Sequence, residues 1–195
     1  KMEAFLDEAM DIGYLGLSID MLPWHRIEAG EYIGSPVPSQ HAHVSEYYRL
    51  ARIVRRYGRI LQATPNAFEK LSVVHLALLS MGLFRKSLRT TVVSAMDTKS
   101  NGNVYRLVML AGTVANKILR GNFRWQVLVE PFLNFADGVN TPLFEEFSAG
   151  VDAISASQQE RKTLFGSVEF RDRFRHEWEG PGQRMFHRKF DDMWI

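Results

Sequence analysis

This 195-residue chain contains no cysteine. It therefore has no disulfide framework, no thiolate zinc site and no cysteine nucleophile. It also lacks an excess of one charge: 24 Lys and Arg residues face 22 Asp and Glu residues, and a net charge of +2 does not indicate nucleic acid binding. The longest nearly apolar run, residues 73–84, is shorter than the roughly 20 residues that span a bilayer. We therefore expect neither a nucleic acid nor a membrane partner.

Two further features are missing from the sequence. No glycine-rich phosphate-binding motif occurs. No basic segment followed by an apolar core opens the chain, because residues 1–6 begin directly in a helical pattern. We therefore expect a cytoplasmic protein, and we interpret the chain as a piece of a longer one.

Short apolar segments alternate with amphipathic ones along the first two thirds of the chain. The periodicity predicts helices over residues 3–12, 45–57, 67–83 and 104–119, and strands over residues 14–19, 59–64, 88–95 and 123–129. Ser45 is the expected N-cap of the second helix. This α/β alternation predicts a parallel sheet, which is either an open doubly wound sheet or about half of a barrel.

The pattern changes after Pro131, where residues 142–178 look helical throughout and no strand follows. Phe170, Phe174 and Trp178 recur at four-residue spacing, which is typical of a buried helix face. We therefore divide the chain into residues 1–130, the α/β part, and residues 131–195, a mainly helical appendage or barrel insertion.

Candidate binding residues follow the expected strands, because ligands bind at the carboxyl ends of parallel strands. The polar residues at such ends are Ser18, Asp20, Gln62, Thr64, Asn66, Ser94, Asp97 and Lys99. The alternative is that they satisfy backbone groups of the loops. In the first long loop, Trp24, His25 and Arg26 combine an aromatic face, an imidazole and a cation, which suits a substrate carboxylate, although a loop anchored by a buried Trp24 explains them as well.

Other charged clusters favour simpler interpretations. His41 and His43 lie between a proline-rich loop and a helix start, where their side chains would diverge, so we predict a polar loop and no metal site. For the basic cluster we predict a solvated helix face; its members are Arg49, Arg52, Arg55, Arg56 and Arg59. In residues 123–126, alternation would put Phe123 and Trp125 on one face of a strand and Arg124 and Gln126 on the other.

Two segments resemble a known family. Residues 8–18 (Glu-Ala-Met-Asp-Ile-Gly-Tyr-Leu-Gly-Leu-Ser), followed by a long loop and residues 48–58 (Tyr-Arg-Leu-Ala-Arg-Ile-Val-Arg-Arg-Tyr-Gly), look like the middle of an N-acyl-D-amino-acid deacylase of the amidohydrolase superfamily. Residues 165–178 are similar to the helical segment that follows in such deacylases. The resemblance implies a section of a (β/α)8 metallohydrolase barrel, in which zinc or a similar divalent metal activates water to attack an amide carbonyl.

The sequence departs from the family at the expected metal ligands. Ala63-Thr64-Pro65-Asn66 stands where the resemblance places one histidine, and Ser94-Ala95-Met96-Asp97 where it places another. We predict no metal or other cofactor bound to this chain and assign no catalytic residue. Substrate contacts are expected from six residues, Trp24, His25, Arg26, Asn66, Asp97 and Lys99.

These observations lead to two hypotheses. In the first, the longer protein is a hydrolase that acts on amide C–N bonds of small molecules such as N-acyl amino acids, and this chain alone is inactive. In the second, the chain is a non-catalytic α/β binding or interaction domain that has lost the metal site. A half barrel also exposes strand edges and apolar surface, so we expect the isolated chain either to pair with another copy, as a homo-oligomer, or to aggregate.

Overall fold

The computed structural model of the chain describes residues 1–23, 25–27, 29–66, 70–93, 95, 104–127, 135–136, 138–181, 186 and 188. The chain forms two compact units. The first comprises Lys1–Pro23, Pro38–Asp97 and Asn103–Glu130. The second comprises Trp24–Val37, Thr98–Gly102 and Pro131–Ile195.

The first unit alternates helices with parallel strands, as the sequence predicts. Its elements are α1 (Met2–Asp11), β1 (Gly16–Asp20), the 3-10 helix η1 (Pro38–His41), α2 (Val44–Arg56), β2 (Ile60–Thr64), α3 (Lys70–Ser80), β3 (Arg89–Val92), α4 (Val104–Thr113), the π-helix η2 (Val114–Ile118) and β4 (Asn122–Trp125). The predicted strand over residues 88–95 was too long, because β3 ends at Val92. The predicted helix over residues 104–119 changes to a π-helix at Val114.

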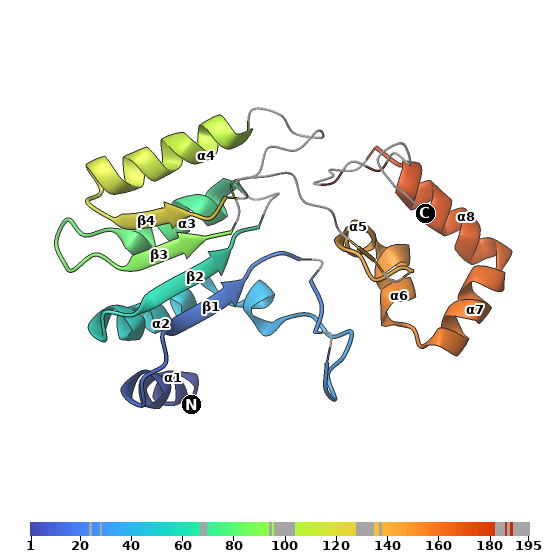
Figure 1. Cartoon of the computed structure of the whole chain (residues 1–195), viewed down its shortest axis with the longest axis horizontal. Helices are drawn as coiled ribbons and strands as arrows, with labels where there is room; N and C mark the ends of the chain where they lie inside the picture. The colour runs from blue at the N-terminus through green and yellow to red at the C-terminus, as the bar shows by residue number, and fades with distance from the viewer. Residues whose placement is uncertain are drawn as a thin grey trace. The chain divides into compact units, whose positions relative to one another are not determined.

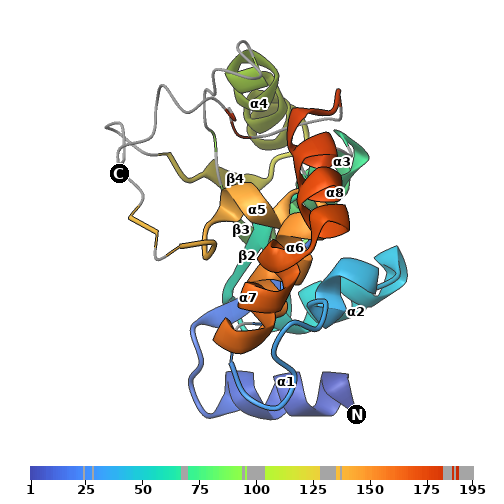
Figure 2. The same cartoon turned by 90° about the vertical axis from the view of Figure 1, so that its right-hand side faces the viewer.

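The four strands form one parallel sheet in the order β1-β2-β3-β4, so each strand pairs with the one that precedes it. The register aligns Ser18 with Gln62, Gln62 with Thr91, and Thr91 with Arg124. Right-handed crossovers between strands added in one direction place all connecting helices on the same face. Figures 1 and 2 show α2 and α3 together on one face of the sheet.

That face carries the hydrophobic core of the first unit. Leu61, Ala63, Val92 and Phe123 are at most 1% exposed and pack with buried residues of α2, α3 and η2. Trp125 packs against the same core, whereas Arg124 is exposed. The predicted alternation along residues 123–126 is thus confirmed.

Gly16 allows β1 to approach β2 closely. A Cβ atom at this position would lie 1.9 Å from the carbonyl oxygen of Ile60, far inside van der Waals contact. Only glycine fits at this close approach of the two backbones.

The described residues of the second unit form the helices α5 (Pro142–Glu145), α6 (Ser148–Ser155), α7 (Gln158–Gly166) and α8 (Val168–Glu179). The expectation of continuous helix over residues 142–178 was wrong, because extended residues separate α6 from α7 and α7 from α8. Ser157 caps α7 in a reciprocal capping box with Glu160, and the Ser167 hydroxyl accepts a hydrogen bond from the N–H of Phe170 at the start of α8.

Aromatic side chains make up much of the second unit's core. Phe147, Phe170 and Trp178 are buried, and Phe144, Phe165 and Phe174 pack against them. The guanidinium of Arg188 lies over the ring of Phe147, 4.7 Å from its centroid. Its Nη2 atom is 3.1 Å from a carboxylate oxygen of Glu146, and the two side chains are only 4% and 0% exposed.

Candidate functional site

The face of the sheet opposite the helices carries mainly polar side chains. Its middle row consists of Ser18, Gln62, Thr91 and Arg124, one residue from each strand. Ser18 and Arg124 are exposed, and Gln62 and Thr91 are half-buried. The side-chain amide of Gln126 donates a hydrogen bond of 3.1 Å to the Thr91 hydroxyl, which shows that Gln126 shares this face. This open polar face is the candidate functional surface of the first unit.

Asp20 ends β1 at the carboxyl edge of the sheet and holds the loop that returns to η1. Its backbone N–H donates to the Ser39 hydroxyl oxygen at 3.1 Å, and that hydroxyl donates to the Asp20 carbonyl at 2.6 Å. An Asp20 carboxylate oxygen accepts the N–H of Leu22 at 2.9 Å. The Tyr47 hydroxyl donates to the carbonyl of Ser39, and burial, with smaller effects from the charges of Glu46 and Asp20, raises the pKa of Tyr47.

Thr64 and Asn66 lie at the carboxyl end of β2. The Thr64 carbonyl accepts the N–H of Met21 at 2.9 Å, and the Asn66 carbonyl accepts the Ser72 hydroxyl at 3.1 Å. We expected Ser18 and Gln62 at strand ends, but they occupy the middle of β1 and β2. Each strand continues for two residues beyond them, to Asp20 and Thr64. Ser94 lies outside the described residues.

The described residues do not form a metal site of the kind that the family resemblance implies. Within the described ranges, no three His, Asp or Glu side chains are placed to hold a metal ion. Thr64 and Asn66 occupy the expected position of one histidine, and a hydroxyl and an amide are poor substitutes for an imidazole ligand of zinc.

His43 has a structural role that the sequence analysis missed. Its Nδ1 atom accepts the N–H of Ser45 at 3.3 Å, and Glu46 accepts the N–H of His43 at 3.0 Å, which forms a capping box at the start of α2. Our assignment of Ser45 as the N-cap was therefore wrong. His41 is the last residue of η1.

The six residues predicted to contact substrate have different outcomes. Asn66 belongs to the first unit, whereas His25 and Arg26 belong to the second. Within the second unit, His25 Nε2 lies 3.7 Å from a carboxylate oxygen of Glu145, and Arg26 Nη1 donates to the carbonyl of His25 at 2.9 Å. These contacts place His25 beside α5 and Arg26 against the backbone of its own loop. Trp24, Asp97 and Lys99 lie outside the described residues.

The basic cluster on α2 is only partly a solvated face. Arg49 and Arg56 form ion pairs with Glu3 and Asp7 of α1. Arg55, in contrast, is buried and donates to the carbonyl of Leu79, which contradicts the prediction for this residue. Burial, together with the nearby charge of Arg85, lowers the pKa of Arg55 to about 10. Arg55 follows Ala51 by four residues, so helical spacing could have placed it on the buried stripe.

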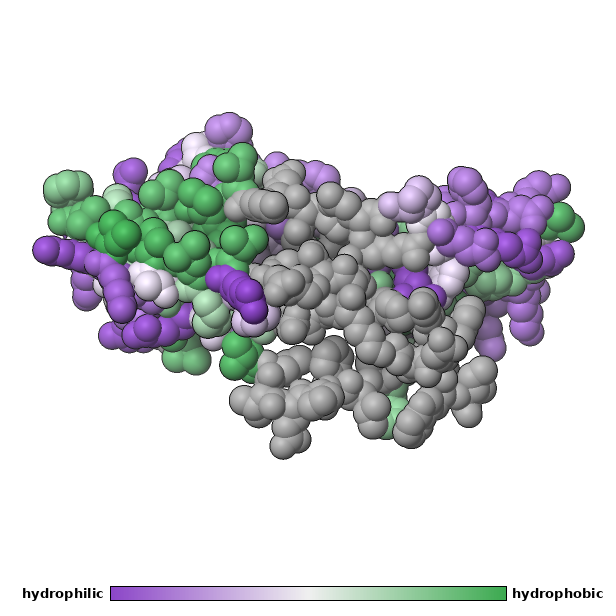
Figure 3. Space-filling view, turned by 90° about the horizontal axis from the view of Figure 1, so that it is seen from above, coloured by the Kyte–Doolittle hydropathy of each residue, from purple (hydrophilic) through white to green (hydrophobic). Residues whose placement is uncertain are grey.

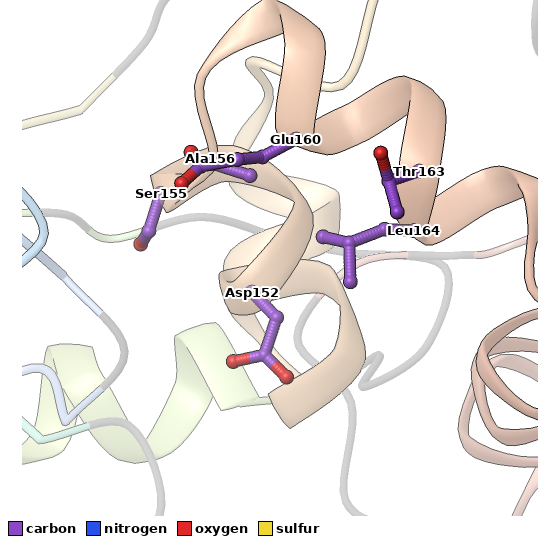
Figure 4. A pocket seen from close by; sticks show the side chains of 6 residues that line it. All are labelled: Asp152, Ser155, Ala156, Glu160, Thr163 and Leu164. Carbon is purple, nitrogen blue, oxygen red and sulfur yellow. The ribbon is translucent and has the colours of Figure 1, made fainter.

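The second unit contains a shallow groove between α6 and α7 (Figure 4). Its volume is about 490 Å³. It is lined by Asp152, Ser155, Ala156, Glu160, Thr163 and Leu164. Asp152 is paired with Arg173, and Glu160 takes part in the capping box of α7, so the two acids already have structural roles.

Comparison with known proteins gives relatives without an assigned activity. An uncharacterized protein of Mycobacterium bovis and two of Mycobacterium tuberculosis are each 32% identical to the chain over 98% of its length. The chain spans about a third of the length of these curated relatives, 32% in each case. No family model matches the chain, and no solved structure matches it at a significant level.

Proposed function

We propose that the chain is the central section of a (β/α)8 barrel and that the longer protein hydrolyses an amide C–N bond of a small molecule such as an N-acyl amino acid. One observation is the main support for a barrel. The four strands β1–β4 are parallel and follow one another in chain order, with helices on one face of the sheet and mainly polar side chains on the other. A doubly wound sheet reverses its strand order and has helices on both faces, whereas a barrel does neither.

The helices at both ends of the sheet support the same proposal. On α1, Phe5 is 74% exposed, although Leu6 and Met10 of the same helix are buried. At the other end, α4 exposes 58% of Leu107 and 59% of Leu110, and the adjoining η2 exposes 65% of Ile118. Figure 3 shows the apolar surface over α4. Apolar helix faces at both margins are expected where a barrel continues with a further βα unit on each side.

The amide substrate class rests on the resemblance to N-acyl-D-amino-acid deacylases. In β/α barrels, the residues that act on substrate lie at the carboxyl ends of the strands. Here this edge carries Asp20, Thr64 and Asn66. Their backbone groups form hydrogen bonds with Met21, Ser39 and Ser72, which tie this edge to the adjoining loops and α3. Among the described residues, Thr64 and Asn66 stand at an expected ligand position and do not fit a zinc ion.

One observation favours the second hypothesis, a binding domain without catalysis. Thr64 and Asn66 replace the family's strand-end histidine, and the described ranges hold no other cluster of ligands.

The experiment uses the longer protein that carries this chain. Saturable hydrolysis of N-acetyl amino acids that falls at least tenfold in Asp97→Asn would support the enzyme, with Asp172→Asn on α8 as the control. Metal content measured on the same sample tests the implied cofactor. Tight binding of these compounds without turnover would favour the binding domain.

A further inference from the structure

Arg124 is an exposed cation in the middle row of the polar face, on the edge strand β4. Alternation along β4 directs its side chain away from Phe123 and Trp125, which pack into the core. In the described part of the chain, Arg124 has neither an ion pair nor a hydrogen bond through its side chain. If further strands close the barrel over this face, the guanidinium becomes enclosed, and an enclosed guanidinium requires an anion.

The neighbours of Arg124 in its row carry hydroxyl and amide groups. Thr91 lies beside it on β3, followed by Gln62 on β2 and Ser18 on β1. Because Gln126 donates to the Thr91 oxygen, the Thr91 hydroxyl proton is free to donate to another acceptor. The row therefore offers hydrogen-bond donors next to a fixed positive charge.

The face has little negative charge of its own. Asp20 is the one acidic residue among the positions of β1–β4 that point to this side, and it lies on β1, at the opposite margin of the sheet. Three strand spacings of about 4.8 Å put some 14 Å between the backbones of β1 and β4, which is too far for an ion pair. The Asp20 carboxylate also accepts the N–H of Leu22.

We infer that Arg124 binds the carboxylate group of a small organic acid, and that Thr91 and Gln62 donate to the same ligand. A planar guanidinium binds a carboxylate through two parallel hydrogen bonds, which a lysine ammonium cannot reproduce. The identity of this acid as the N-acyl amino acid substrate rests on the proposed function. With that substrate, the polar face would recognise the carboxylate end of the molecule.

The kinetic test compares an N-acetyl amino acid with its neutral carboxamide in the longer protein. Arg124→Gln is expected to raise KM for the acid about 100-fold and to leave kcat unchanged, because the contact is equal in the ground and transition states. KM for the carboxamide should not change. Arg124→Lys should recover only part of the affinity. Arg89→Gln is the matched control, since Arg89 lies on the same face one row nearer the amino ends of the strands.

A calorimetric binding measurement separates this inference from the proposed function. If the protein does not hydrolyse amides but binds N-acetylglycine in preference to N-acetylglycinamide, and Arg124→Gln abolishes that preference, the inference stands and the proposed function fails. If hydrolysis is normal and Arg124→Gln affects the acid and the carboxamide equally, the inference is wrong and the proposed function stands. Should Arg124→Gln not fold, as judged by circular dichroism, the acid-to-carboxamide KM ratio in Arg124→Lys decides in its place.

Discussion

The buried pair of Arg188 and Glu146 predicts a large and specific loss of stability. In Arg188→Met, the Glu146 carboxylate, which is fully buried, loses its countercharge, while it still accepts a hydrogen bond from the N–H of Phe186. The substitution also removes hydrogen bonds to the carbonyls of Glu177 and Trp178. Breaking one side of a buried ion pair costs about 3–5 kcal/mol, and we expect that loss in the free energy of unfolding.

Urea denaturation of the whole chain measures this loss, and amide hydrogen exchange of α8 localises it. Arg175→Met is the matched control: Arg175 pairs with Asp172, both side chains are about two-thirds exposed, and the expected cost is below about 0.5 kcal/mol. In the double variant Arg188→Met with Glu146→Leu, no charge is left buried, so the loss should shrink to about 1–2 kcal/mol. The reasoning would be refuted if Arg188→Met lost no more unfolding free energy than Arg175→Met. It would also be refuted if the double variant lost as much as Arg188→Met alone.

Three further predictions concern the first unit and its controls. Gly16→Ala should destabilise the chain by about 3 kcal/mol or prevent folding, because the new Cβ would clash with the Ile60 carbonyl; Gly166→Ala, with open space around it, should be neutral or slightly stabilising in the same thermal melt. Asn116→Ala should cost about 2 kcal/mol and speed hydrogen exchange at Phe123, because the Asn116 amide bonds both the N–H and the carbonyl of Phe123; unchanged exchange would contradict this. The raised pKa of Tyr47 means that its contribution to stability is complete below about pH 10 and is lost as the pH rises further, so Tyr47→Phe should flatten the fall in stability above pH 10; an unaltered slope would exclude Tyr47 as its source.

The sequence predicted the order of helices and strands in the first unit because hydrophobic periodicity is a local property. It also placed Phe123 and Arg124 on opposite faces of β4, since alternation is fixed within one strand. The position of Arg124 beside Thr91 depends on register between strands that are far apart in the chain, and no local pattern gives that register. The polar row was therefore visible only in the structure.

Capping explains two other differences. Residues 142–178 look like one long helix because Ser157 and Ser167 are tolerated inside helices, yet Ser157 with Glu160 three residues later is a capping box that could have been recognised. His43 offered no such signal, because histidine is not among the preferred N-cap residues and its role depends on the orientation of the ring toward the N–H of Ser45.

The strand order of the first unit has a consequence for its synthesis. Each strand pairs with the strand that the ribosome made just before it, so no strand must be inserted later between two neighbours that are already joined. The sheet can grow one βα unit at a time as the chain emerges, with each new strand adding to the margin left by the last. Interrupting translation between units would then leave a shorter sheet of the same pattern, whose last strand is ready to pair with the next.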